Sequence, residues 1–429
     1  MKKRRSEHRS DRQGERVRIV VREARKGEEE KLADSGFRSF RTADRESWLK
    51  YVFRENPHLV APDTLVAEIG GQIAGQASGF RFTMSLAGRD VPVRGIAAVA
   101  VVPEFRRQGV ADAVMLALHR QMKRRKEALS MLYPFRMSFY RKFGYGTVEW
   151  LEFLRVSPDQ LPESPLRRNV RRFDREKDAA ALARAYEAAR AGTSGRILRS
   201  KDWWDVRVLA RVGEGVVYVD PGSRRITGYA LFDIPADPPY PRQHALVREL
   251  VAATPEAFRG ILGFFESLGD QYKMLELSFP RGQGLGLEQN FGVIGLPEPL
   301  RLFQTAGYAS AGAMLRLVDV AAAFALHPGP AANGARGRLG LDLEDPVFPG
   351  QTGAFDVTFG ASGARVARGR SARDRLALSV ATLAQIYGGG TSARVQLGQG
   401  MIAGSARAAR LLDRAFEGPP VHLLPLNGF

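Results

Sequence analysis

The feature that most constrains the fold is an apolar run followed by a polar turn and an amphipathic helix. Residues 95–102 (GIAAVAVV) are almost entirely apolar, which is typical of a central strand buried on both faces. Pro103 ends this strand, because proline has no backbone N–H to donate to a sheet. Over residues 109–126 apolar side chains recur on one side, and basic residues close the segment, as in an amphipathic helix. The region therefore predicts a mixed α/β protein built around a strand–turn–helix unit.

The turn between this strand and this helix has the features of an anion-binding site. It carries the pattern Arg106-x-x-Gly109-x-Ala111. A helix N-terminus presents unpaired N–H groups and a positive dipole end to an anion. Gly109 and the small Ala111 allow close approach of the backbone, and Arg106 and Arg107 can add charge-assisted hydrogen bonds. The turn therefore predicts a site for a phosphate-bearing ligand, with a strand–turn–helix without a ligand as the alternative.

Three more segments sharpen this interpretation. The chain reads Tyr-Pro-Phe-Arg over 133–136, Phe-Tyr-Arg-Lys-Phe-Gly-Tyr-Gly over 139–146, and Leu-Ala-Gln-Ile-Tyr-Gly over 383–388. Together with the phosphate turn, they resemble the GNAT superfamily of acetyltransferases, and within it the Eis (enhanced intracellular survival) family, along the whole chain. The resemblance implies an α/β (α+β) fold with two tandem GNAT-like domains, the second degenerate, followed by a sterol-carrier-protein-like α+β domain.

The resemblance also implies acetyl-CoA as co-substrate and an amine as acceptor. In GNAT proteins the strand before the phosphate turn is splayed, and its free backbone groups pair with the pantetheine amides. The positions that match the family's acetyl-CoA contacts are Val99, Ala100, Val101, Arg106, Arg107, Gln108, Gly109, Val110, Ala111, Asp112, Phe135 and Arg136. The acceptor class is a primary amine of a small molecule or of a lysine side chain, with an aminoglycoside or a polyamine as examples.

Two further positions match the family's catalytic groups. Tyr140 matches the general acid for the departing thiolate, and Phe429 matches the last residue, whose α-carboxylate is the general base. An α-carboxylate with a pKa of about 3.5 is ionised at neutral pH, and a phenol with a pKa of about 10 is protonated. The alternatives are a buried packing tyrosine and a frayed terminus. The apolar stretch 421–426 favours a docked terminus.

Length and composition are consistent with several folded domains. The chain has 429 residues, which is too long for one compact core. Of these residues 44% are hydrophobic and 26% are charged, which is typical of a folded protein. Prolines at 158, 162 and 165 indicate a linker. We expect a basic disordered N-terminus over 1–16, a catalytic GNAT domain over 17–160, a degenerate GNAT-like domain over 161–305, and a sterol-carrier-protein-like domain over 306–429 that supplies the C-terminal carboxylate.

Individual elements can also be predicted. Residues 65–68 and 73–78 alternate around Gly70-Gly71, which indicates a hairpin. In the second unit we expect helices over 177–190 and 255–268, and strands over 215–219, 226–234 and 274–279. In the third unit we expect helices over 318–326 and 373–387. The pattern Arg281-x-x-Gly284-x-Gly286 repeats the phosphate turn without a clear helix after it, and we interpret it as a surface loop.

Composition excludes several other classes of function. The absence of cysteine excludes disulfides and thiolate chemistry, and the six histidines show no paired spacing, so no metal site is expected. A net charge of +18 would attract nucleic acid, yet no nucleic-acid-reading motif is present. No secretory signal and no membrane-spanning run are recognisable, so we expect a cytoplasmic protein. A nucleic-acid-binding protein and a lipid or small-ligand carrier remain as alternatives, and the family resemblance implies a homo-oligomer, a hexamer.

Overall fold

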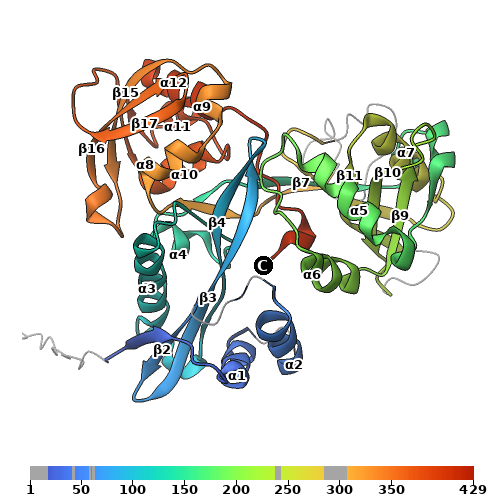
Figure 1. Ribbon diagram of the computed structural model, residues 1–429, viewed down its shortest axis with the longest axis horizontal. Coiled ribbons are helices and arrows are strands. Elements are labelled where there is room, and N and C mark those ends of the chain that lie inside the picture. The colour runs from blue at the N-terminus through green and yellow to red at the C-terminus, as the bar shows by residue number, and fades with distance from the viewer. Residues whose placement is uncertain (1–17, 41–43, 58, 60–62, 237–242, 285–306) are drawn as a thin grey trace, which may run out of the picture.

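The computed structural model describes residues 18–40, 44–57, 59, 63–236, 243–284 and 307–429. These residues form two seven-stranded sheets and one five-stranded sheet, each with its own helices. The three sheets belong to three lobes, with the second and third lobes lying on either side of the first (Figure 1). Within the described residues no helix is both long and apolar enough to cross a membrane.

The first sheet carries the predicted strand–turn–helix unit. Its order is β1 (Val20–Glu23), β2 (Thr64–Ile69), β3 (Gln72–Leu86), β4 (Arg89–Val101), β5 (Leu129–Leu132), β14 (Met314–Leu317) and β6 (Gly146–Thr147). The predicted hairpin is confirmed, since β2 and β3 pair antiparallel around Gly70 and Gly71, whose φ angles of +57° and +78° suit a glycine turn. The helices are α1 (Glu29–Phe40), α2 (Arg45–Trp48), α3 (Val110–Arg124) and α4 (Met137–Arg141).

The second sheet contains elements in the same sequence order as the first sheet. It runs β13 (Gly307–Ala311), β7 (Trp150–Val156), β12 (Met274–Pro280), β11 (His244–Ala252), β10 (Ile226–Asp233), β9 (Glu214–Val219) and β8 (Val170–Arg172). Its helices are α5 (Arg175–Arg190), α6 (Lys201–Trp203) and α7 (Pro255–Glu266). The succession β9-β10-β11-α7-β12 parallels β2-β3-β4-α3-β5, with β11 and β12 parallel as β4 and β5 are. The sequence had not indicated β11.

The third sheet has the order β17 (Gly363–Arg368), β16 (Gly353–Gly360), β15 (Gly337–Glu344), β18 (Arg375–Ser379) and β19 (Ala403–Gly404). Its helices are α8 (Val320–Leu326), α9 (Gly329–Ala332), α10 (Val380–Tyr387), α11 (Ala393–Gly398) and α12 (Ala406–Phe416). The predicted helix over 373–387 is wrong in its first half, which forms β18. Leu376 and Leu378 are buried on one face with the two-residue period of a strand, and the Ser379 side chain caps α10.

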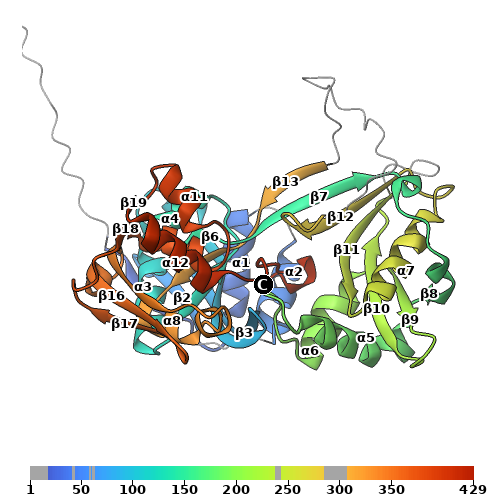
Figure 2. The same cartoon turned by 90° about the horizontal axis from the view of Figure 1, so that it is seen from above.

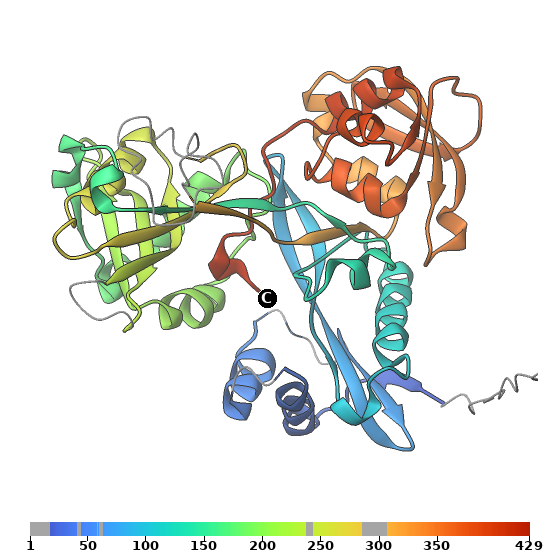
Figure 3. The same cartoon turned by 180° about the vertical axis from the view of Figure 1, so that it is seen from behind.

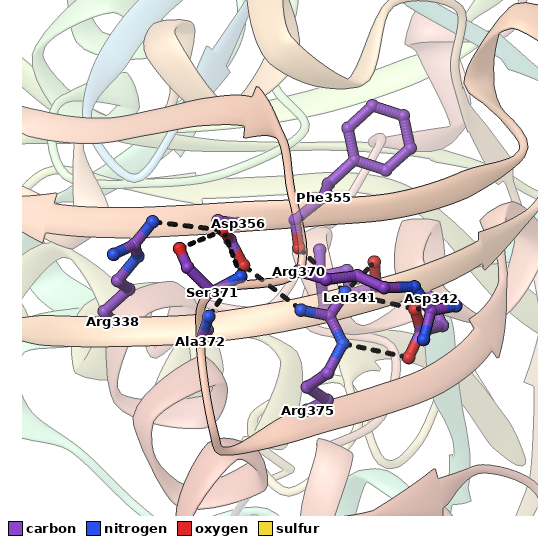
Figure 4. A network of polar contacts seen from close by, with 9 residues as sticks. All are labelled: Arg338, Leu341, Asp342, Phe355, Asp356, Arg370, Ser371, Ala372 and Arg375. Atoms are coloured by element: carbon purple, nitrogen blue, oxygen red, sulfur yellow. Dashed lines mark hydrogen bonds and ion pairs between the residues drawn. The ribbon is translucent and has the colours of Figure 1, made fainter.

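A polar network holds three strands of this third sheet together. Asp356 on β16 accepts hydrogen bonds from Arg338 (3.0 Å), from the Ser371 hydroxyl (2.7 Å) and from Arg375 (3.1 Å), and Arg375 on β18 also pairs with Asp342 on β15 (Figure 4). Because each carboxylate bridges neighbouring strands, the network fixes the order of β15, β16 and β18.

The strands near the predicted domain boundaries at 160 and 305 cross between sheets. β7, which precedes residue 160, pairs with β12 and β13 of the second sheet. β14, which follows residue 305, pairs with β5 and β6 of the first sheet. Figure 2 shows β7 and β13 running side by side toward the second lobe. The boundaries between the first and second sheets therefore do not fall at residues 160 and 305. Hydrogen bonds between strands far apart in the sequence determine which strand belongs to which sheet.

The last residues of the chain belong to a core shared by all three lobes. One buried cluster contains Phe82 from β3, Tyr186 from α5, Leu339 from β15, and Val421 and Leu423 from the C-terminal segment. Residues 421–424 and Asn427 are therefore buried, and the position of this segment depends on all three domains.

A buried carboxylate anchors this C-terminal segment. Glu149 has no exposed surface, and its carboxylate accepts hydrogen bonds from the backbone N–H of Leu423 (2.7 Å) and of Ala313 (3.0 Å). Burial raises the pKa of Glu149 to about 7, although both N–H groups favour the ionised form.

This raised pKa predicts a measurable loss of stability with increasing pH. A glutamate in an unfolded chain titrates near pH 4.3, so between about pH 4.3 and 7 the folded protein binds more protons at Glu149, and its stability falls as pH rises. Glu149→Gln should remove a pH-dependent loss of about 3 kcal/mol across this window. Urea unfolding near pH 4.5 and near pH 8 would measure it, with the exposed Glu163→Gln as control. Parallel pH profiles for wild type and Glu149→Gln would contradict the prediction.

Candidate active site

The first sheet opens between its two central strands. β4 and β5 pair in parallel only from Arg94 to Ile96, opposite Ser130 to Leu132. Ala98 then adopts a φ of +51°, and the register between β4 and β3 shifts at the same place. Such a bulge bends a strand away from its neighbour. Within the described residues no strand pairs with β4 beyond Ile96 on the β5 side, so backbone groups of Val99–Val101 are available to a ligand.

The predicted phosphate turn lies at the end of the same strand. Arg107 has a φ of +62°, and Gly109, with a φ of +84°, begins α3 without any side-chain cap. The first helical hydrogen bond joins the Ala113 N–H to the Gly109 carbonyl oxygen (2.9 Å), so the N–H groups of residues 110–112 have no intrahelical acceptor. Residues 106–109 are exposed. The turn can therefore surround a phosphate with backbone N–H groups.

Side chains around the turn hold it in place. Arg106 donates to the Ser39 carbonyl oxygen at the end of α1 (2.9 Å), and Gln108 donates to the Glu104 carbonyl oxygen (3.1 Å). Asp112 in the first turn of α3 forms an ion pair with Lys142, just after α4. The turn thus lies between α1 and α4, and α4 follows the end of β5.

The second domain repeats the opening but not the phosphate turn. β11 and β12 pair only from His244 to Leu246. At the start of α7, Pro255 has no N–H, and the Thr254 hydroxyl accepts the N–H of Ala257 (3.2 Å). This helix N-terminus therefore has fewer free donors than that of α3. The Arg281 pattern follows β12, where residues 281–283 are exposed, and its last glycine, Gly286, lies outside the described residues.

Tyr140 lies on α4, close to the open end of β5. Its side chain is only 3% exposed, and its ring packs edge-on against Phe135 (5.4 Å between ring centroids), Phe139 (5.0 Å) and Tyr145 (6.2 Å). Burial raises the pKa of Tyr140 well above its ordinary value of 10. The described residues give its hydroxyl no hydrogen-bond partner, so a protonated phenol is available as a donor.

The last residue lies where β4 and β5 separate. A Cβ atom added at Gly95 would come within 2.7 Å of the Phe429 ring, so this ring lies directly on β4. The same ring is 5.0 Å from that of Phe82 and 5.8 Å from that of Tyr133, which follows β5. Figure 3 shows the chain end in the space between the first sheet and the second lobe.

The structure therefore gathers the predicted residues around one opening. Val99–Val101 and residues 106–112 lie along β4 and the start of α3, while Phe135, which is 67% exposed, and Arg136 lie beside Tyr140 at the start of α4. Sequence reasoning missed Phe82 and Gly95, which form the surface under Phe429. A glycine inside a strand of otherwise larger residues was the available signal, because it indicates close approach of another group.

Comparison with known proteins agrees with this geometry. Acetyltransferase (GNAT) domain families match residues 20–148 and 195–287, and a sterol carrier protein domain family matches residues 320–424. No curated protein matches the chain. The matches show that the chain carries two acetyltransferase domains of the GNAT type and one sterol carrier protein domain.

Whole-chain likenesses identify the arrangement of the three domains. Eis1 from Mycobacterium abscessus is 21% identical, with a TM-score of 0.75 over 96% of this chain and 100% of its own. A probable N-acyltransferase from Enterococcus faecalis V583 is 22% identical (TM-score 0.77, 94% and 98% covered). A GCN5-related N-acetyltransferase from Anabaena variabilis is 19% identical (TM-score 0.76, 94% and 98% covered). The chain therefore shares the three-domain fold of these proteins, Eis1 among them.

The difference between the two helix N-termini predicts a single acetyl-CoA site per chain. Gly109→Asp places a carboxylate at the exposed phosphate turn, at a φ that disfavours aspartate, so acetyl-CoA binding should be lost. Isothermal titration calorimetry should give one site in wild type and none in the variant. Gly389→Asp, at a φ of +73° with open space around it in the third domain, is the matched control and should bind normally. Two sites in wild type, or unchanged binding by Gly109→Asp, would contradict the prediction.

Proposed function

We propose that the chain transfers an acetyl group from acetyl-CoA to a primary amine, with Tyr140 as general acid and the Phe429 α-carboxylate as general base. The observation that carries this proposal is the position of Phe429, whose ring lies on Gly95 where β4 and β5 separate. Tyr140 follows the other strand of the same opening, in α4. The two groups thus reach the opening from segments that are far apart in the sequence.

The residues at the opening fit acetyl-CoA. The free N–H groups of residues 110–112 suit the pyrophosphate, and Arg107 supplies a nearby positive charge. The side of Val99–Val101 that faces away from β3 has no strand partner and suits the pantetheine amides, and Phe135 offers an exposed apolar surface beside Arg136. Acetyl-CoA brings the activated thioester, and the chain supplies binding, orientation and proton transfer.

The two proposed catalytic groups have complementary roles. An ammonium ion has no lone pair to attack a thioester, so a base must remove one proton, and an α-carboxylate is ionised at neutral pH. Collapse of the tetrahedral intermediate releases a thiolate, which needs a proton from a nearby acid. The buried, protonated hydroxyl of Tyr140 suits that donation, because its raised pKa keeps the proton in place until the thiolate forms.

The acceptor belongs to the class of primary amines. A small amine, including an aminoglycoside or a polyamine, and a lysine side chain share the nucleophile that this chemistry needs. Asn427 and Gly428, directly before the proposed base, carry no charge. An assembly into a hexamer, which the resemblance to the Eis family implies, and a cytoplasmic location, which the sequence led us to expect, complete the proposal.

The proposed base predicts a strong effect of extending the chain. Residues added after Phe429 convert its carboxylate into an amide and move the charged group by about 3.5 Å per residue. Turnover should fall by about 100- to 10,000-fold, while acetyl-CoA affinity stays unchanged. Phe429→Ala keeps a terminal carboxylate and should retain more activity than the extended protein. Steady-state rates of the wild-type, extended and Phe429→Ala proteins with one good amine acceptor would test this prediction. The same extension placed before Met1 is the control. Full activity of the C-terminally extended protein would refute the assignment of the Phe429 carboxylate as the base.

The proposed acid predicts a selective effect of removing one hydroxyl. Tyr140→Phe keeps the ring in its aromatic cluster and should lower kcat by about 100-fold or more without weakening acetyl-CoA binding. Tyr145→Phe is the matched control, because the Tyr145 hydroxyl lies in the same cluster but is hydrogen-bonded to Ser130 (2.8 Å). The raised pKa of Tyr140 further predicts no loss of wild-type activity through its ionisation below about pH 10. Equal losses in both variants would refute the assignment.

A further inference from the structure

The second domain contains a buried ion pair that nothing so far explains. Arg199 donates two hydrogen bonds to the carboxylate of Glu249 on β11, at 2.9 and 2.6 Å, and neither side chain has exposed surface. The Tyr229 hydroxyl donates a further hydrogen bond to the same carboxylate (2.6 Å). Burying two charges is unfavourable unless their geometry satisfies them, and a buried ion pair is weak evidence for stability. A positional role is the better-supported use of such a pair.

A third N–H group of Arg199 is directed at the C-terminal segment. Its Nε–H donates to the side-chain oxygen of Asn427 (2.7 Å), and Asn427 is fully buried. The Asn427 amide in turn donates to the Tyr186 hydroxyl (3.2 Å), and the Trp203 indole N–H donates to the Leu426 carbonyl oxygen (3.2 Å). Three side chains of the second domain therefore hold residues 426 and 427. We call Arg199, Glu249 and Asn427 the clamp.

The clamp is also tied to the acetyl-CoA domain. Arg199 ends a loop that runs alongside β3, with backbone hydrogen bonds from the Gly195 N–H to the Ser85 carbonyl oxygen and from the Leu198 N–H to the Thr83 carbonyl oxygen, both 2.8 Å. β3 pairs with β4 along its length, so Arg199 has a fixed position relative to the opening of the first sheet.

The clamp also restricts the position of the proposed base, because Asn427 lies close to Phe429 in the sequence. Only Gly428 lies between Asn427 and Phe429, so the terminal carboxylate lies within about 7 Å of the clamped backbone. The Phe429 ring on Gly95 is the second point of attachment. A general base needs a defined position as well as a suitable charge, because a displacement of about 1 Å can lower a rate by about 100-fold.

We propose that Arg199, Glu249 and Asn427 are positioning residues for the general base, and that holding the chain end is the role of the second acetyltransferase-like domain. The proposal rests on the proposed function of the Phe429 carboxylate. It agrees with the start of α7, where Pro255 and the Thr254 cap leave little of a phosphate site. The second domain keeps the fold of the first and supplies a rigid anchor in place of a second reaction.

The test compares Asn427→Ala, in the full chain, with the same change in the C-terminally extended protein. Asn427→Ala should lower kcat by about 10- to 100-fold with unchanged acetyl-CoA affinity, since the phosphate turn is untouched. In the extended protein the base is already gone, so the same substitution should leave the residual rate unchanged. Asn427→Asp keeps the oxygen that accepts from Arg199 and should retain more activity than Asn427→Ala.

Two further variants separate positioning from loss of stability. Glu249→Gln weakens the hold on Arg199 and should lower kcat in the same manner as Asn427→Ala. Asp356→Asn breaks a carboxylate network in the third domain that does not contact the C-terminal segment, and it should leave kcat unchanged (Figure 4). Circular dichroism melts of each variant would identify one that fails to fold, in which case Asn427→Asp and Glu249→Gln carry the comparison.

Three outcomes would overturn the clamp. Wild-type kcat in Asn427→Ala, together with an inactive extended protein, would refute the clamp but leave the base intact. An equal loss in the wild-type and extended backgrounds would show a purely structural role. Full activity of the extended protein would remove the base itself, and with it the reason for a clamp.

Discussion

The function of the first domain depends on one interruption in a parallel pair of strands. β4 and β5 share three paired positions and then separate at the bulge around Ala98. A parallel sheet without that bulge would use every backbone donor and acceptor of Val99–Val101 in its own ladder. Because the strands separate, the β5-facing side of Val99–Val101 has no strand partner, and the ring of Phe429 lies on Gly95 beside the point of separation. The proposed roles of the phosphate turn and of both proposed catalytic groups depend on this opening.

Attachment between distant segments holds the opening in a defined form. β14, which follows the second domain in the sequence, pairs with strands of the first sheet. β7, which follows the first domain in the sequence, pairs with strands of the second sheet. The C-terminal segment then enters a core to which all three lobes contribute, with Glu149 bonded to Leu423 and Arg199 bonded to Asn427. A site assembled from segments far apart in the sequence needs such cross-connections, because local structure alone does not hold these segments together.

The two acetyltransferase-like domains show how one fold can serve two purposes. Both have a parallel pair that separates after three positions, followed by a helix. Gly109 leaves the start of α3 open, whereas Thr254 and Pro255 largely close the start of α7. A few residues at a helix N-terminus thus decide how many backbone N–H groups are free for an anion. The buried charges Glu249 and Arg199 belong to this second use.

The sequence by itself determined several local elements, among them the turn and the helix that follow β4. The hairpin at Gly70-Gly71 and the helix after Gly109 follow from turn residues and periodicity, which are properties of neighbouring residues. Only the tertiary structure decided that residues 375–379 form a strand, that β7 and β14 cross between sheets, and that Phe429 lies on Gly95 beside a clamp at Asn427. These features depend on contacts between residues up to hundreds of positions apart. No pattern along the chain records such contacts, because packing and hydrogen bonding select them only when all three domains are in place.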